Sequence, residues 1–258
     1  MLVKKLCSTL VNRATLLYKT LGNITSEFIK PGTFPYREVG PTKMKWWIGL
    51  SLNLFARTYL GVEYLNLDNL PENGPAIVAS NHFSHLDGLL INAASGYRSR
   101  REVVFLAAED VYNKNQVFRM MCNIVNCIPV KRDQKDRVAL LKAIRILKRG
   151  KMLGIFPEGR RSRDGMIGEA KDGVAIVALT TGCPVIPVGI DGTFEALPRN
   201  HKFIRPAKVN LIFGNALLYP KQRKPSQSII RSVKEEIMYE IRKLRNEAYD
   251  FRDRKIAA

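Results

Sequence analysis

The sequence is poor in the side chains that bind metal ions and form disulfides. Its 258 residues include four cysteines and three histidines, and no two cysteines form a Cys-x-x-Cys pair. The cysteines also have no metal-ligand spacing with the histidines, so we expect no metal site. We interpret them as small buried hydrophobic residues of a reducing compartment. The four are Cys7, Cys122, Cys127 and Cys183.

Long apolar runs are absent as well. The best candidate, residues 46–60, contains Asn53 and Arg57 and is shorter than the roughly 20 apolar residues that span a bilayer. Near the amino terminus, Arg13 and Lys19 interrupt the apolar stretch, and no small-residue cleavage site follows it. The sequence therefore predicts neither a transmembrane helix nor a signal peptide.

Acidic residues are scarce. The chain has 42 Lys and Arg against 23 Asp and Glu, which gives a formal net charge of +19. Such a field attracts phosphates, whether of nucleic acid, of anionic lipid headgroups or of an anionic substrate. A nucleic-acid binder needs a recognisable module or aromatic residues interleaved with basic ones. The aromatic residues cluster instead with the amino-terminal apolar segments, so we expect no nucleic-acid partner.

Residues 1–62 form a basic, apolar segment. Apolar or small residues from Val3 to Phe28 recur in steps of three and four, which predicts one face of a helix. A second apolar helix opens with Trp46 and Trp47, and the segment holds nine Lys and Arg against two acids. One interpretation is a helical hairpin packed on the main domain. The other is an interfacial anchor on a phospholipid membrane, with its cations on the anionic headgroups.

Residues 63–258 show short apolar runs that alternate with helical patterns. This alternation predicts an α/β domain with a single mixed, mostly parallel sheet flanked by helices. The expected strands are Ala76–Ser80, Val103–Ala107, Ile124–Val130, Met152–Phe156, Pro184–Ile190 and Val209–Phe213. The expected helices lie near Leu86–Ser95, Tyr112–Cys122, Asp133–Lys148, Lys171–Thr181 and Ser226–Asn246.

The first candidate site is the stretch Asn81–Gly88, which follows a predicted strand. One interpretation is purely structural: Ser84 and Asp87 have the spacing of a capping box at the start of the next helix. The other is chemical: Asp87 reaches back to a ring nitrogen of His82, fixes its tautomer and stabilises its protonated form. The spacing alone supports either interpretation.

The second candidate site is the turn Pro157–Arg163, in which three arginines follow a buried strand. It is either a solvated basic turn or a phosphate clamp, because guanidinium groups bind phosphate oxygens in pairs. The third candidate is Arg132, which follows another strand end. Ligands of α/β sheets usually bind at such strand ends.

The order of these motifs resembles the glycerophospholipid acyltransferase (PlsC-type) family, over roughly residues 60–215. The resemblance implies an α/β acyltransferase domain at residues 63–258 and gives residues 1–62 a membrane-docking role. The protein would lie on the cytoplasmic face of a membrane, as a peripheral or monotopic protein. The motifs that carry it are Asn81-His82-Phe83-Ser84-His85-Leu86-Asp87, Arg132, Phe156-Pro157-Glu158-Gly159-Arg160-Arg161-Ser162, Lys171-x-Gly173 and Pro184-Val185-Ile186-Pro187-Val188.

The resemblance also implies the activity: transfer of a fatty acyl group from acyl-CoA or acyl carrier protein to the hydroxyl of a lysophospholipid, with 1-acylglycerol 3-phosphate as the first candidate. No cofactor is expected. The chain departs from the family in two places. Arg160 stands where the family usually has threonine, and Ala107-Ala108 stands where many members have a lysine that holds the acceptor phosphate. These departures leave open a different hydroxylated lipid as acceptor.

The resemblance assigns roles to individual residues. His82 would be the general base and Asp87 its orienting partner. Arg161, supported by Arg160 and Arg163, would hold the acceptor phosphate, and Arg132 is a second candidate for binding phosphate. Glu158 positions the acceptor or braces the turn, in which Gly159 and Ser162 also belong to the expected binding site.

A hydrolase that acts on an acyl thioester through the same dyad remains the alternative from another class. No Gly-x-Ser-x-Gly elbow supplies an enzyme nucleophile, so direct attack by the acceptor hydroxyl is expected.

Overall fold

The computed structural model describes residues 43–130, 136–199, 201 and 203–257. Residues 41–258 group into one compact unit. The predicted helix over residues 3–28, and the residues up to 42, lie outside the described part, as does Arg132. The membrane role of residues 1–62 therefore stays a prediction.

The described residues contain one sheet of seven strands in the order β1-β7-β6-β2-β5-β3-β4. Strands β2 to β6 are parallel to one another, whereas β7 is antiparallel to β6, and β1 runs parallel to β7. The predicted mixed, mostly parallel sheet is thus confirmed. The strands are β1 (Glu63–Leu65), β2 (Ala76–Ser80), β3 (Val103–Ala108), β4 (Cys127–Val130), β5 (Met152–Ile155), β6 (Val185–Asp191) and β7 (Asn210–Phe213).

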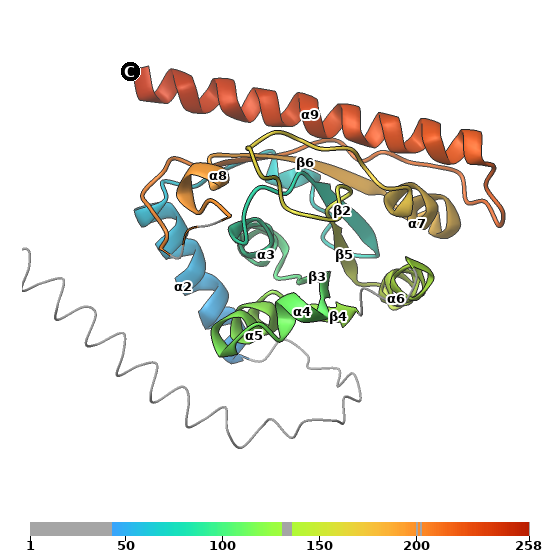
Figure 1. Cartoon of the computed structure of the whole chain (residues 1–258), viewed down its shortest axis with the longest axis horizontal. Coiled ribbons are helices and arrows are strands. Elements are labelled where there is room, and N and C mark those ends of the chain that lie inside the picture. The colour runs from blue at the N-terminus through green and yellow to red at the C-terminus, as the bar shows by residue number, and fades with distance from the viewer. Residues whose placement is uncertain (1–42, 131–135, 200, 202, 258) are drawn as a thin grey trace, which may run out of the picture. The chain divides into compact units, whose positions relative to one another are not determined.

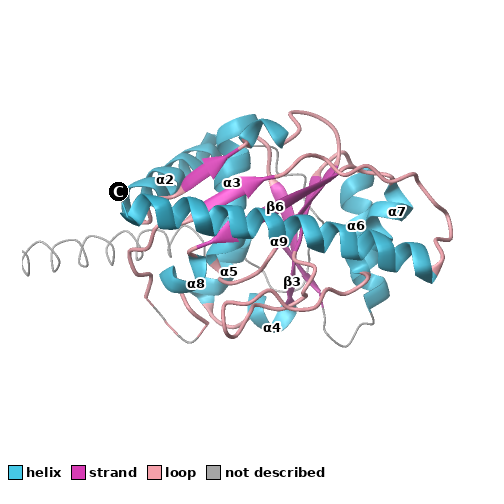
Figure 2. Ribbon diagram, turned by 90° about the horizontal axis from the view of Figure 1, so that it is seen from above, coloured by secondary structure: helices cyan, strands magenta, loops and turns pink. Residues whose placement is uncertain are grey.

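Helices cover both faces of this sheet (Figure 1). Helices α2 and α3 share a core with one face, and α6, α7 and α9 share a core with the other. Seen from above, α9 runs across β6 (Figure 2). The helices are α2 (Lys43–Tyr59), α3 (Leu86–Ser99), α4 (Glu109–Tyr112), α5 (Gln116–Ile124), α6 (Asp136–Lys148), α7 (Gly173–Thr181), α8 (Thr193–Ala196) and α9 (Gln227–Ala257), with a 3₁₀ turn at Leu67–Asn69.

Strand β2 shows why the sheet needs both layers. Its five residues are all buried, and successive side chains point to opposite faces. Ala76 and Val78 join the core under α2 and α3, while Ile77 and Ala79 join the core under α6, α7 and α9. The continuous apolar run of this strand is typical of a parallel sheet that is covered on both sides.

Several of the predicted boundaries were wrong. The helix expected near Tyr112–Cys122 is divided, since α4 ends at Tyr112 and α5 begins at Gln116. The strand expected at Ile124–Val130 begins only at Cys127, because α5 continues to Ile124 and Asn126 takes a left-handed turn with φ 53°. The last helix extends beyond Asn246 to Ala257. This extension packs partly on the protein, since Ala248 is buried and Arg252 binds Asp191.

Candidate active site

The site lies at the carboxyl edge of the parallel strands. Strand β2 lies between β6 and β5, so Asn81 and His82, which follow it, emerge at the middle of the sheet. The neighbouring strand β5 leads into Phe156 and the arginine turn. The topology therefore brings together the first two candidate sites of the sequence, which lie more than seventy residues apart in the chain.

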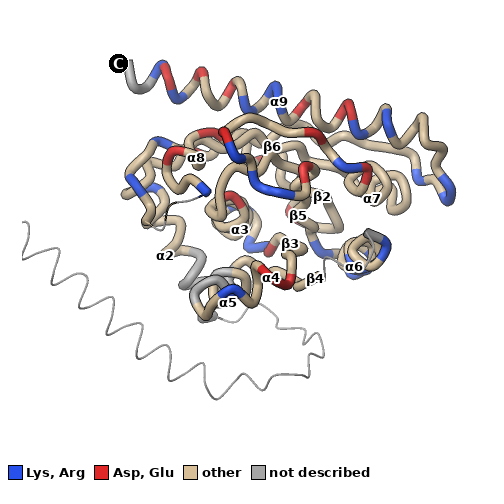
Figure 3. The backbone as a smooth tube through the Cα atoms, in the orientation of Figure 1, with Lys and Arg blue, Asp and Glu red and all other residues tan. Residues whose placement is uncertain are grey.

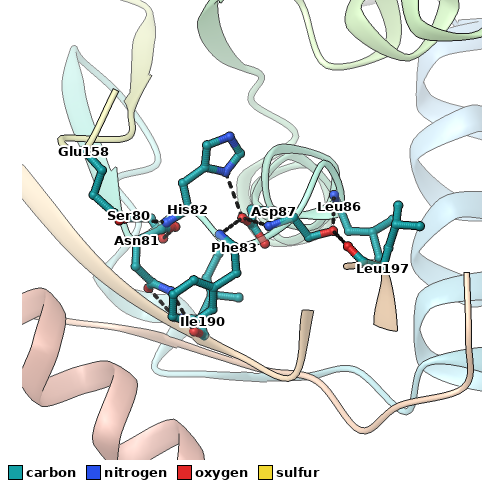
Figure 4. Close-up of polar contacts among 10 residues, drawn as sticks. Ser80, Asn81, His82, Phe83, Leu86, Asp87, Glu158, Ile190 and Leu197 are labelled. Carbon is teal, nitrogen blue, oxygen red and sulfur yellow. Dashed lines mark hydrogen bonds and ion pairs between the residues drawn. The ribbon is translucent and has the colours of Figure 1, made fainter. Parts of the chain in front are cut away.

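Asn81 fixes the start of the site loop to the adjacent strand β6. Its side chain is fully buried. The amide Nδ2 donates to the carbonyl of Ile190 at 2.8 Å, and Oδ1 accepts from the N–H of the same residue at 2.9 Å. Because both ends of the amide are occupied, the side chain acts as a two-point clamp on the backbone just before His82 (Figure 4).

The carboxylate of Asp87 organises the loop that carries His82. Its Oδ2 lies 2.9 Å from Nδ1 of His82 and also accepts the backbone N–H groups of Phe83 and Ser84, at 2.7 and 2.8 Å. The N–H of Leu86 donates in turn to the Ser84 hydroxyl at 3.3 Å. One half of the predicted capping box, the contact of the Asp87 carboxylate with the Ser84 N–H, is therefore present together with the His–Asp contact.

The imidazole of His82 is held in one orientation. Its ring stacks on Phe156, with centroids 3.9 Å apart and an interplanar angle of 11°. Since the Asp87 carboxylate accepts at Nδ1, that nitrogen carries the proton and Nε2 is left as an acceptor. The second ring nitrogen points away from Asp87 in Figure 4, and 18% of the side chain is exposed.

Glu158 connects the two halves of the site through backbone hydrogen bonds. One carboxylate oxygen accepts the N–H of His82 at 2.9 Å, and the other accepts the N–H of Gly168 at 2.8 Å. Burial raises the pKa of this carboxyl group, and the two backbone donors oppose that shift. Because both oxygens are occupied, Glu158 braces the His82 loop against the loop after β5.

The arginine turn is built against His82. Gly159 has a φ of +67°, a conformation in which glycine avoids strain, and Ser162 donates its N–H to the carbonyl of His82 at 2.8 Å. Arg160 is exposed, whereas Arg161 is half-buried. The turn appears as a run of Lys and Arg in Figure 3. Among these arginines, the pKa of Arg161 is affected by the charge of Asp87, which opposes the effect of burial.

Two cations near the site, Arg199 and Lys114, were not predicted from the sequence. Burial lowers the pKa of Arg161, and the charge of Arg199 adds to this shift. Burial also lowers the pKa of His85 to about 3, reinforced by the charges of Arg161, His82, Lys114 and Arg199. Arg199 lies eight residues beyond the end of β6, in a loop without a motif, so no pattern in the sequence marks it.

Metal ligands do not gather around these residues. Within the described ranges, no three His, Cys, Asp or Glu side chains are placed to share a metal ion. The arrangement is instead an imidazole base with a buried carboxylate partner, beside a half-buried guanidinium. It can remove a proton from a hydroxyl group while an anion binds nearby.

The Acyltransferase family model matches residues 61–191, just over half of the 258 residues. The chain therefore belongs to this acyltransferase family. The matched region includes β1 to β6 and every described residue of the His–Asp pair and the arginine turn. It ends before the loop that carries Arg199.

Known proteins agree with this assignment. A chloroplastic 1-acyl-sn-glycerol-3-phosphate acyltransferase of Brassica napus is 30% identical over 66% of this chain and 49% of its own length. A probable 1-acyl-sn-glycerol-3-phosphate acyltransferase of Mycoplasma pneumoniae is 30% identical over 60% of this chain and 61% of its own. The chain thus spans about half the length of the plant relative.

A solved structure has the same fold. The crystal structure of the 1-acyl-sn-glycerophosphate acyltransferase PlsC from Thermotoga maritima matches with a TM-score of 0.60 and 27% identity. The match covers 81% of this chain and 84% of that one. It confirms the α/β architecture predicted from the sequence.

Proposed function

We propose that this protein transfers a fatty acyl group from an acyl thioester, of CoA or acyl carrier protein, to the free hydroxyl of 1-acylglycerol 3-phosphate. The observation that carries this proposal is the His82–Asp87 pair held beside Arg161 by the hydrogen bond between Ser162 and the His82 carbonyl. The activities for which the Brassica, Mycoplasma and Thermotoga relatives are named support the same acceptor.

The residues suggest a direct mechanism. Nε2 of His82 takes the proton of the acceptor hydroxyl as its oxygen forms a bond to the thioester carbonyl carbon. The carbon–sulfur bond then breaks, and the imidazolium returns the proton to the thiolate that leaves. Asp87 stabilises the imidazolium between these steps, as a buried carboxylate does in other His–Asp pairs. Glu158 supports the base by accepting a hydrogen bond from the backbone N–H of His82.

Arg161 would hold the phosphate of the acceptor. A planar guanidinium presents paired donors to phosphate oxygens, and the position of Arg161 in the turn is fixed by Ser162. Arg160 and Arg163 are exposed and would add only a screened attraction at the rim of the site. Of the two roles expected for Glu158, we assign it the bracing of the turn, because each of its carboxylate oxygens accepts a backbone N–H.

An exposed apolar surface on α2 supports a membrane-bound state. Leu54 is 64% exposed, and Leu50, Phe55 and Tyr59 are exposed beside it. The hydroxyl of Tyr59 donates to the carbonyl of Ile204, whose neighbour Phe203 is 82% exposed. Apolar side chains gathered among cations are typical of an interfacial contact with lipid. None of the described helices is long and apolar enough to cross a membrane.

The proposal is tested with the purified full chain and a panel of acceptors. Acyl-CoA is supplied with lysophosphatidate, lysophosphatidylcholine, lysophosphatidylglycerol or monoacylglycerol, and both CoA release and acylated lipid are measured. We expect lysophosphatidate to be acylated fastest. Equal CoA release with and without any acceptor would instead identify a thioester hydrolase. Acylated carrier protein, tested as a second donor, separates the two donor classes.

A further inference from the structure

The loop between β6 and β7 reaches both halves of the active site. Its residue Leu197 accepts a hydrogen bond at 3.0 Å from the hydroxyl of Ser84, which lies in the His82 loop and is fully buried. On its other side, the ring of Phe194 packs against Gly165 of the arginine loop, where an added Cβ would meet the ring at 3.3 Å. Arg199 follows Leu197 by two residues, so its backbone is anchored at the edge of the site.

The charges of Arg199 and Arg161 act on one another. Burial is the largest cause of the lowered pKa of Arg161 and of His85. Arg199 adds to the shift of Arg161, and both arginines add to the shift of His85. Lys114, which follows α4, acts on His85 in the same direction. Three cations from three separate loops therefore act on one half-buried, neutral imidazole, and each raises the cost of the others' charge.

These two arginines are not neutralised as others in the protein are. Arg245 and Arg252 both pair with the buried Asp191. Within the part of the chain that the structure describes, no carboxylate lies within ion-pair distance of Arg161 or Arg199. Asp87 lies outside ion-pair distance of Arg161; its Oδ2 accepts three hydrogen bonds, and no hydrogen bond from the described residues reaches its Oδ1. Two guanidinium groups in this arrangement favour a bound anion with several oxygens.

We propose that Arg199 and Arg161 together form a clamp for the phosphomonoester of the acyl acceptor, with Arg199 supplied by the loop beyond the family motifs. The nature of the acceptor rests on the proposed function. A phosphomonoester has a free dianionic end that can meet two guanidinium forks, whereas the phosphodiester of a zwitterionic lysophospholipid is capped by its headgroup. The clamp therefore makes the site selective for lysophosphatidate.

Steady-state kinetics test which substrate Arg199 holds. For Arg199→Ala we expect the KM for lysophosphatidate to rise about 10- to 100-fold, as for the loss of a charged hydrogen bond. The KM for acyl-CoA should change less than twofold. Arg199→Lys should fall between the wild type and the alanine variant, and Arg205→Ala, an exposed arginine on the same loop, should behave as wild type.

Two kinetic results would contradict the clamp. An unchanged lysophosphatidate KM in Arg199→Ala would show that the guanidinium does not bind the acceptor. A rise confined to the acyl-CoA KM would assign it to the donor's phosphates instead.

A binding experiment separates failure of the clamp from failure of the proposed function. The imidazole resonances of His85 are followed by NMR in the full chain at neutral pH, where sn-glycerol 3-phosphate is mostly dianionic, as this ligand is added. We expect the resonances to shift in the wild type, because a bound dianion changes the electric field that Arg161 and Arg199 exert on the imidazole, and to shift much less in Arg199→Ala. The Arg205→Ala control should respond as the wild type does.

The outcomes are distinct. If sn-glycerol 3-phosphate shifts the His85 resonances only when Arg199 is present, but lysophosphatidate is never acylated, the clamp stands and the proposed function is overturned. If lysophosphatidate is acylated and neither the NMR response nor the KM depends on Arg199, the proposed function stands and the clamp is overturned.

Discussion

Glu158, in the turn that follows β5, holds the backbone of His82 through a hydrogen bond. The hydrogen bond from the His82 N–H to the Glu158 carboxylate measures 2.9 Å, and the second oxygen of the same carboxylate binds Gly168. The carboxylate is buried. In the proposed mechanism this residue positions the base and does not bind the acceptor, so its loss should affect kcat more than the acceptor KM.

Glu158→Gln should lower kcat more than it changes the acceptor KM. The amide keeps one acceptor oxygen but turns an NH₂ group toward a backbone N–H, which costs about 1–3 kcal/mol. We expect a lower melting temperature and a reduced kcat with lysophosphatidate. Glu169→Gln, an exposed neighbour in the same loop, is the control. A rise in the acceptor KM at constant kcat would show that Glu158 contacts the acceptor.

Asn81→Asp should destabilise the fold, because it removes the side-chain amide group that donates to the carbonyl of Ile190. The buried carbonyl of Ile190 then loses its partner and faces a carboxylate oxygen instead. We expect a loss of about 1–3 kcal/mol in the free energy of unfolding. That corresponds to about 2–4 °C of melting temperature per kcal/mol. Asn215→Asp, an exposed substitution of the same kind, should stay close to wild type.

Stability should fall as the pH drops, in part because of His85. Its pKa is about 3 in the folded protein and about 6.5 in an unfolded chain. Between these values the unfolded state binds the extra proton, so the free energy of unfolding decreases by up to about 1.4 kcal/mol per pH unit. His85→Gln removes this contribution. We expect its melting temperature to depend less steeply on pH from 6.5 downward, and equal slopes for the two proteins would contradict the assignment.

The exposed apolar face of α2 should govern binding to lipid. The double variant Leu54→Asp, Phe55→Asp replaces two exposed side chains, so the melting temperature should change little. Sedimentation with vesicles of phosphatidylcholine and phosphatidylglycerol should show weaker binding. Tyr239→Asp, which alters an exposed aromatic residue on α9, is the matched control. Wild-type vesicle binding by the double variant would leave α2 as an ordinary packed helix.

Local patterns in the sequence predicted most of the fold. The apolar runs of β2, β3 and β6 are long enough, and buried enough, to be recognised directly. Strand β1 was missed because its three residues are only partly buried and carry no apolar run. The start of β4 was misplaced because apolar residues continue from the helix α5 through the turn at Asn126.

The candidate site could be predicted where its contacts are local. His82 and Asp87 are five residues apart, so the spacing alone placed them within reach of each other. The contacts of Glu158 and Leu197 join residues far apart in the chain, and only the folded sheet brings them together. Arg199 is an exposed charge in a loop, and such a residue looks the same in sequence whether it binds an anion or only water.

Acyl transfer by His82→Ala shows whether His82 is the general base. With acyl-CoA and lysophosphatidate we expect kcat to fall about 10²–10⁴-fold, while circular dichroism and vesicle binding stay as in the wild type. His82→Gln should fall similarly, since it restores side-chain volume beside Phe156 without a basic nitrogen. His201→Ala, an exposed histidine, should keep full activity. A His82→Ala enzyme that turns over at the wild-type rate would show that His82 is not the general base.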